Sequence, residues 1–108
     1  MQITITWKAF ENFTIPATQH RQSVTSATIE LNGMFVDESR EKDLCDILYQ
    51  ETNLWQGSLW NKLQPVLPAL RTHTSLSIGD EVAITNGDVT RTYRCVDVGW
   101  ELLTKVSN

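Results

Sequence analysis

The spacing of the apolar residues changes along this chain, from alternation to a helical period and back again, and this limits the folds open to it. "QITITWKAF" near the N-terminus alternates, with Ile3, Ile5 and Trp7 on one side, which is typical of a strand with one buried face. Between residues 38 and 53 the apolar residues are spaced as in a helix. Alternation returns after residue 81. A chain whose β halves enclose helical material belongs to the α+β class.

The two β halves predict one antiparallel sheet of about five or six strands. In the first half, Asn32-Gly33 tolerates the positive φ angles of a two-residue turn. We therefore expect residues 24–31 and 34–36 to pair as a hairpin. In the second half, Asn86-Gly87 opens a turn, and Gly99 interrupts the ladder before the final strand.

The stretch "RTHTSLSIGDEVAI", residues 71–84, combines His73 with hydroxyl and carboxylate side chains, so it could be a site or a scaffold. The residues are better explained as structure. We expect Ser75 to Asp80 to form a tight turn, with Gly79 in the strained conformation and Asp80 accepting hydrogen bonds from nearby amides. A strand then carries Val82 into the sheet.

The central segment predicts one main helix over residues 38–53 and a short helix within "QGSLWNKLQP". Gly57 separates the two helices and Pro65 ends the second. Glu51 projects onto the apolar stripe of the main helix, so either the helix ends before it or Glu51 has a polar partner. The residues of that stripe are Leu44, Ile47, Leu48, Leu54 and Trp55.

The negative charge of the chain is concentrated in one segment. The formal net charge is −4, and residues 37–51 hold six acids and two bases, so this segment carries the whole excess. Surfaces that bind nucleic acids are usually basic, because neutralising phosphates supplies most of the affinity. The charge therefore argues against direct nucleic-acid binding.

The side chains that carry most enzyme chemistry are not arranged for it. His20 and His73 are the two histidines, and neither has a second ligand at metal-binding spacing, so we expect no metal and no cofactor. Cys45 lies among carboxylates, which raise the pKa of a thiol and weaken it as a nucleophile. Asp80 and Glu81 are adjacent in a predicted strand and point to opposite faces. We predict that the protein is not an enzyme.

Length and composition favour a single domain over residues 1–108, and we expect it in the cytoplasm. The chain has no apolar run of membrane-spanning length, and its start lacks the pattern of a secretory signal. Cys45 and Cys95 lie far apart in the sequence and are expected to be free, buried thiols.

The acidic helix is the candidate site, and two interpretations remain open. It is either a solvated outer face, helped by Glu38 and Lys42 at i,i+4, or a docking surface for a protein with a basic surface. Two tryptophans flank the connector "QGSL", and tryptophan is a common interface anchor. The candidate partner-binding residues are Glu38, Lys42, Asp43, Asp46, Tyr49, Asn53, Trp55 and Trp60.

Two segments, "SLSIGDEVAI" and "YRCVDVGWELL", resemble small accessory proteins and domains of bacterial plasmids, conjugative elements and phages, the YodL-like group among them. In that group an acidic or aromatic-bearing helical segment precedes a "SLSVGDVV" stretch, and a strand ending in "GF" or "GW" follows. The likeness covers roughly residues 44–101. It implies a mobile-element or phage gene and brings no catalytic motif. The residues that carry it are Ser75, Leu76, Ser77, Gly79, Asp80, Val82, Tyr93, Cys95, Val98, Gly99 and Trp100.

These observations favour a non-enzymatic protein-binding module, a phage or mobile-element protein that binds and inhibits a host factor (anti-defence or anti-CRISPR type). The alternative is a nucleic-acid-binding regulator of a mobile element, supported by scattered bases such as Arg91 and Arg94. A small enzyme is the third hypothesis. Its most plausible form uses a cysteine nucleophile, and buried, unreactive thiols at Cys45 and Cys95 would exclude that form. The sequence specifies neither the partner and host nor the oligomeric state.

Overall fold

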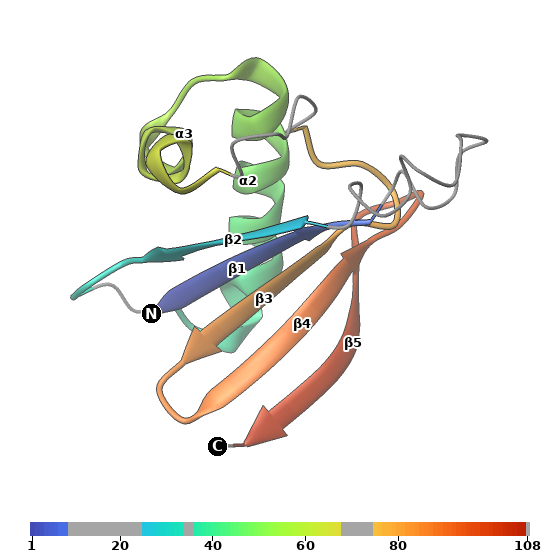
Figure 1. Ribbon diagram of the computed structural model, residues 1–108. Helices are drawn as coiled ribbons and strands as arrows, with labels where there is room; N and C mark the ends of the chain where they lie inside the picture. The colour runs from blue at the N-terminus through green and yellow to red at the C-terminus, as the bar shows by residue number, and fades with distance from the viewer. Residues whose placement is uncertain (9–24, 34–35, 68–74, 108) are drawn as a thin grey trace.

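The computed structural model describes residues 1–8, 25–33, 36–67 and 75–107 of the 108-residue chain. It is an α+β fold, with a five-stranded antiparallel sheet, one long helix and one short helix (Figure 1). This confirms the predicted class and the helical insertion between two β halves. The strands are β1 (Gln2–Trp7), β2 (Thr25–Glu30), β3 (Glu81–Asn86), β4 (Val89–Cys95) and β5 (Trp100–Ser107). The helices are η2 (Glu38–Arg40), α2 (Glu41–Leu54), α3 (Ser58–Leu63) and η3 (Gln64–Val66).

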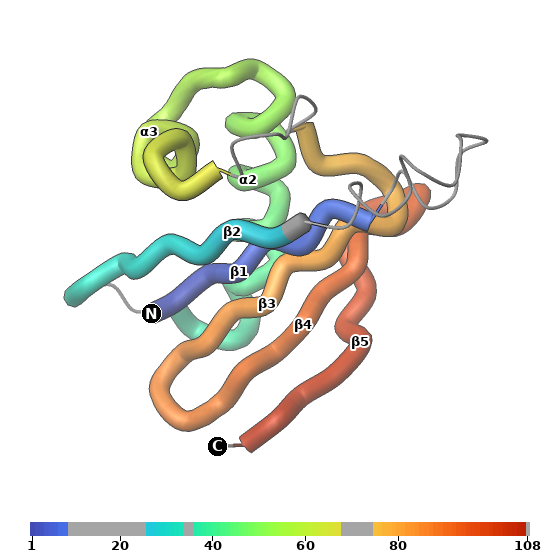
Figure 2. The backbone as a smooth tube through the Cα atoms, viewed as in Figure 1, coloured from blue at the N-terminus to red at the C-terminus, as the bar shows by residue number. Residues whose placement is uncertain are grey.

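The strand β1 joins the two β halves, because the sheet order is β2-β1-β3-β4-β5, as the path of the backbone in Figure 2 shows. Its inward residue Ile3 lies opposite Ile29 of β2 and Ile84 of β3. Strands from opposite ends of the sequence therefore contribute to one continuous apolar face.

The predicted hairpin of residues 24–31 with 34–36 lies partly outside the described residues, and the described part does not show it. Strand β2 pairs with β1 and lies at the edge of the sheet. Asn32-Gly33 does form a turn, with Gly33 at φ 75°, but Val36 is not in a strand; residues 34 and 35 lie outside the described residues. The alternation of β2 matches that of β1, so pairing with β1 brings both apolar faces to the same side of the sheet.

The second β half follows the prediction. Gly87 and Asp88 connect β3 to β4, with Gly87 at φ 65°. Gly99, at φ 81°, precedes β5. Tyr93 and Cys95 are both buried on the face that carries the core. The ladder between β4 and β5 slips between Thr92 and Tyr93.

The turn before β3 also follows the prediction. The backbone N–H of Asp80 donates to Ser77 O (2.9 Å), and Gly79 has φ 100°. The buried carboxylate of Asp80 accepts from the backbone N–H of Ser77 (2.8 Å) and of Lys8 (2.7 Å). Asp80 therefore ties the end of β1 to the start of β3. His20, Pro16 and His73 lie outside the described residues.

Helix α2 packs on one face of the sheet, and α3 lies beside it next to β2 (Figure 1). The opposite face of the sheet is polar, with paired hydroxyls such as Thr4 and Thr28 (2.9 Å). The core therefore lies between the helices and a single face of the sheet.

The predicted apolar stripe of α2 is partly wrong. Leu44 and Leu48 are buried, but Ile47, Leu54 and Trp55 are 43%, 64% and 67% exposed. The buried stripe includes two polar residues that find partners inside, so the helix is rotated relative to the face that hydrophobicity alone predicts. That stripe consists of Glu41, Leu44, Cys45, Leu48 and Thr52.

Among the described residues, none of the helices has the length and apolar character that crossing a membrane requires.

Candidate functional site

The outer surface of α2 is set by a buried polar network under its first turn. The carboxylate of Glu41, fully buried, accepts from the hydroxyl of Tyr93 (2.7 Å) and pairs with Arg91 (Nη1–Oε2, 3.1 Å). Glu38 reaches the same guanidinium from outside (3.1 Å). These bonds fix the rotation of the helix, and therefore which side chains face outward.

Burial makes the ionisable groups beneath α2 hard to deprotonate. Burial, followed by the hydrogen bond to Glu41, raises the pKa of the Tyr93 hydroxyl above its ordinary value. Burial also raises the pKa of the Cys45 and Cys95 thiols, and the carboxylates of Asp46 near Cys45 and Asp80 near Cys95 add to the effect. Protonated thiols are weak nucleophiles, so these groups serve the core.

Two rows of side chains run along the exposed side of α2. The flank row, which faces the loops before β3 and β5, consists of Lys42, Asp46, Tyr49 and Asn53 at i, i+4, i+7 and i+11. The outer row has the same spacing one residue further on: Asp43, Ile47, Gln50 and Leu54.

The flank row is anchored to the rest of the fold. Asp46 accepts a hydrogen bond from the indole N–H of Trp100 (3.0 Å). The amide of Asn53 donates to Tyr49 O (2.7 Å) and to Leu76 O (3.4 Å). The orientation of this row is therefore fixed by contacts with β5 and with the turn before β3.

The outer row ends at a tryptophan in an unusual conformation. Among the described non-glycine residues, only Trp55 has a positive φ, at 56°, where it ends α2. Its backbone N–H donates to Glu51 O (2.8 Å), while its side chain is 67% exposed. With Leu54 and Ile47 it gives α2 an exposed apolar edge.

The connector after Trp55 resolves the question of Glu51. Helix α2 continues to Leu54, and Glu51 has a polar partner, because its carboxylate accepts from the backbone N–H of Trp60 (2.9 Å). Gly57, which precedes α3, has no side chain to offer as a cap. Glu51 therefore supplies a capping oxygen to the next helix.

The predicted partner-binding residues separate into three groups. The flank row brings Lys42, Asp46, Tyr49 and Asn53 together, and Asp43 and Trp55 lie on the neighbouring outer side. Glu38 is held in η2 by Arg91 rather than by Lys42. Trp60 is 6% exposed and belongs to the core, so it is removed from the candidate set.

Sequence reasoning missed two exposed apolar residues of α2, Ile47 and Leu54. It assigned both to the core because they fit an apolar stripe. The signal against this was the series Glu41, Leu44, Leu48 and Thr52, whose members also share one face of a helix. This face can be predicted as the buried one only when the partners of its polar residues, Glu41 and Thr52, are known.

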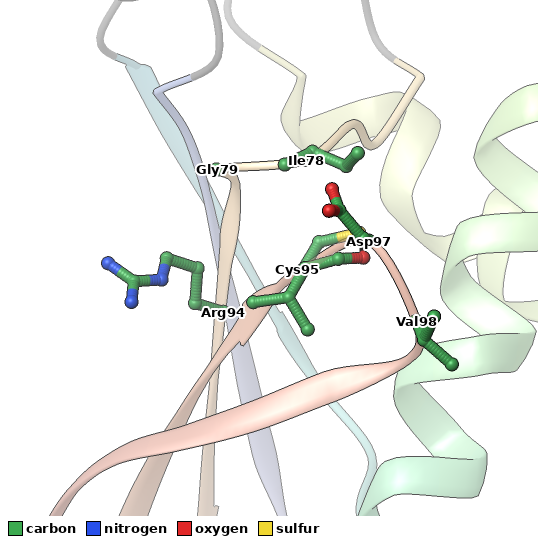
Figure 3. Close-up of a pocket in the computed structure, with 7 residues that line it drawn as sticks. Ile78, Gly79, Arg94, Cys95, Asp97 and Val98 are labelled. Atoms are coloured by element: carbon green, nitrogen blue, oxygen red, sulfur yellow. Dashed lines mark hydrogen bonds between the residues drawn. The ribbon is translucent and has the colours of Figure 1, made fainter.

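Two adjoining hollows lie beside the flank row. The helix-side hollow, about 260 Å³, lies between Asp46 and Tyr49 of α2 and the residues Asp97, Gly99 and Trp100. The loop-side hollow, about 590 Å³, lies between the Ile78–Gly79 turn and Arg94, Asp97 and Val98 (Figure 3). Both are lined by Ile78, Cys95, Val96 and Asp97, so they adjoin, and we call the two hollows together the groove.

Within the part of the chain that the structure describes, no group of three or more histidine, cysteine, aspartate or glutamate residues could hold a metal ion. Comparisons with protein-family models, with curated proteins and with solved structures gave no match. The likeness to small mobile-element proteins therefore stays an expectation from the sequence.

Proposed function

We propose that this chain is a non-enzymatic protein-binding module, and that its partner docks on the outer side of α2. The observation that carries the proposal is Trp55, a largely exposed tryptophan in a left-handed conformation. We call this region the α2 docking surface. It consists of Lys42, Asp43, Asp46, Ile47, Tyr49, Asn53, Leu54 and Trp55.

The conformation of Trp55 argues for a role outside the folding of this chain. Helices commonly end with glycine in the left-handed region, because a Cβ atom there costs roughly 1–2 kcal/mol. A tryptophan at this position bears that cost while burying little of its ring. Strained residues that the fold does not need are concentrated at functional sites, and tryptophan is enriched among residues that dominate interface energies.

The charge around this apolar edge favours a basic partner. Asp43 and Asp46 are exposed, and the segment 37–51 holds the whole net charge of −4. Opposite charges speed association and suppress wrong partners. A host nuclease with a basic nucleic-acid channel has the matching chemistry, which fits an inhibitor from a phage or mobile element. Two free cysteines are compatible with the reducing cytoplasm.

The alternative, a nucleic-acid-binding regulator, loses the bases on which it depended. Arg91 is buried against Glu38 and Glu41, and Arg94 pairs with Glu101 (3.1 Å). Each guanidinium is therefore already paired with a carboxylate, which would compete with a phosphate for it. We therefore prefer the protein-binding function.

Replacing Trp55 separates binding from folding. We expect Trp55→Gly to keep or raise the midpoint of thermal unfolding, because glycine relieves the left-handed strain. We expect the same change to weaken partner binding about 30-fold or more, as loss of an anchor worth about 2 kcal/mol does. The partner would be captured from a bacterial lysate on the immobilised chain, purified, and its affinity measured.

Val106→Ala is the matched control, because Val106 is an exposed apolar residue (53%) on β5, away from α2. It should leave partner affinity unchanged. Equal affinity of the wild type and Trp55→Gly would contradict the proposal. Reversal of Asp43 and Asp46 to lysine should weaken binding most at low salt, and if it does not, the acidic side chains are not part of the surface.

A further inference from the structure

The groove beside α2 has the chemistry to receive one particular kind of side chain. We infer that the helix-side hollow binds an arginine of the protein partner, and that the loop-side hollow holds an aliphatic residue next to that arginine. The inference rests on the proposed protein-binding function and names the segment of the partner that it would recognise. It is carried by the charge, shape and lining of the two hollows.

Within the described residues, the negative charge of the helix-side hollow has no cation paired with it. Asp46 and Asp97 line it from α2 and from the loop before β5, and within the described residues neither forms an ion pair. Lys42, one turn before Asp46, is not paired with it either. Arg94 lines the neighbouring hollow but extends away from Asp97 (Figure 3) and pairs with Glu101. A cation entering the hollow would therefore meet two carboxylates that no cation of the described residues occupies.

The shape and fixed geometry favour arginine among the cations. The indole N–H of Trp100 holds one carboxylate oxygen of Asp46, while the other oxygen has no hydrogen bond within the described residues. Asp97 lines the same hollow from the loop before β5, and its side chain is exposed. A guanidinium has several N–H donors in one plane and can bond to two carboxylates at once. The half-exposed ring of Tyr49 offers a face on which that plane can stack.

The loop-side hollow supplies apolar contact at the next position. Ile78 and Val98, which lie on its two sides, are 57% and 92% exposed. Asp97 belongs to both hollows, so the arginine and its neighbour would lie on either side of one carboxylate. Exposed aliphatic residues on a groove are buried only when a partner fills it. The recognised segment therefore carries arginine beside leucine, isoleucine or valine.

The test is a titration that needs no natural partner. The probe is the peptide acetyl-Gly-Leu-Arg-Leu-Gly-amide, followed by the indole N–H signal of Trp100 in ¹⁵N-correlated NMR spectra of the full chain. We expect a saturable shift of this signal, because Trp100 is bonded to Asp46. A peptide with citrulline, an uncharged isostere, in place of arginine should bind about fivefold more weakly or not at all.

The variant Asp46→Asn with Asp97→Asn should abolish the response while keeping the wild-type unfolding midpoint, since asparagine can still accept from Trp100. The control with the same change of net charge is Asp37→Asn with Asp88→Asn; both residues are exposed and neither lines the groove. The control should bind the peptide as the wild type does. Equal binding of the citrulline peptide, no saturable shift, or binding that survives loss of Asp46 and Asp97 would each overturn the inference.

The two proposals fail separately. If the natural partner depends on Trp55 but the arginine peptide does not bind, the α2 docking surface stands and the arginine site is wrong. If the peptide binds as described but partner affinity is the same with and without Trp55, the arginine site stands and the α2 docking surface is wrong.

Discussion

Among single residues, Glu41 has the largest effect on how α2 is oriented on the sheet. It is a fully buried carboxylate that bonds to Arg91 and Tyr93, and Arg91 Nε is buried without a hydrogen-bond partner among the described residues. The guanidinium therefore depends on Glu41 and Glu38 for its compensation. Removing one member of a buried ion pair leaves an uncompensated charge, which costs more than the pair contributes.

We expect Glu41→Gln to lower the free energy of unfolding by about 2–4 kcal/mol, measured by urea denaturation at neutral pH. Glu38→Gln is the matched control, because its carboxylate bonds to the same guanidinium but is 60% exposed. It should cost less than about 1 kcal/mol. Similar losses for the two variants would show that the burial of Glu41 is not what makes it important.

At the scale of elements, the α2–α3 connector depends on one acid and one glycine. Glu51 caps α3 through the N–H of Trp60. A Cβ atom on Gly57 would lie 2.2 Å from two atoms of the Glu51 carboxyl group, and the φ of Gly57 is 123°. The cap therefore forms only because the residue before α3 has no side chain.

We expect Gly57→Ala to destabilise the fold by about 2 kcal/mol or more, because the added Cβ displaces the Glu51 carboxylate that caps α3 and the alanine is strained at this positive φ. Gly33→Ala is the control; its φ is 75° and, its chain neighbours aside, no atom of the described residues lies within 4 Å of the added Cβ, so strain alone should cost about 1 kcal/mol. In a Glu51→Ala background Gly57→Ala should cost less, because no capping carboxylate is left to displace, and the cost that remains is the backbone strain at Gly57. Strict additivity in this double-mutant cycle would show that the added Cβ does not act through the Glu51 carboxylate.

At the scale of the whole molecule, folding buries two thiols where the helices meet the sheet. Cys45 of α2 and Cys95 of β4 are 0% and 5% exposed and belong to one core. Burial raises the pKa of both thiols. The unfolded chain therefore loses its thiol protons at lower pH than the folded chain, so the folded state loses stability as the pH rises past the ordinary thiol pKa, near 8.5.

We expect the free energy of unfolding to fall by about 1–2 kcal/mol between pH 8 and pH 10 for each buried thiol. Urea titrations at several pH values, under reducing conditions, would measure the slope. The double variant Cys45→Ala with Cys95→Ala should be less stable at pH 7 but show a shallower alkaline decline. An unchanged slope would mean that other groups cause the decline.

Features that depend on neighbouring residues could be predicted from the sequence alone. The alternation at Ile3, Ile5 and Trp7 specified a strand with one buried face, and the chemistry of Ser77, Gly79 and Asp80 specified their turn. The change of period specified helical material between two β halves. These predictions were confirmed because side-chain periodicity and turn geometry depend on residues a few positions apart.

The surfaces that pack together depend on contacts between residues far apart in the sequence, so they were seen first in the folded chain. β2 pairs with β1, a long-range partner whose alternation matches its own, and no local signal in the sequence indicates this partner. The rotation of α2 depended on Arg91 and Tyr93, about fifty residues away from Glu41. From the sequence, an acid within a cluster of acids is predicted to be exposed, because the distant cation that pairs with it is not known. That rotation moved Leu54 and Trp55 outward, and with them the candidate surface of the protein.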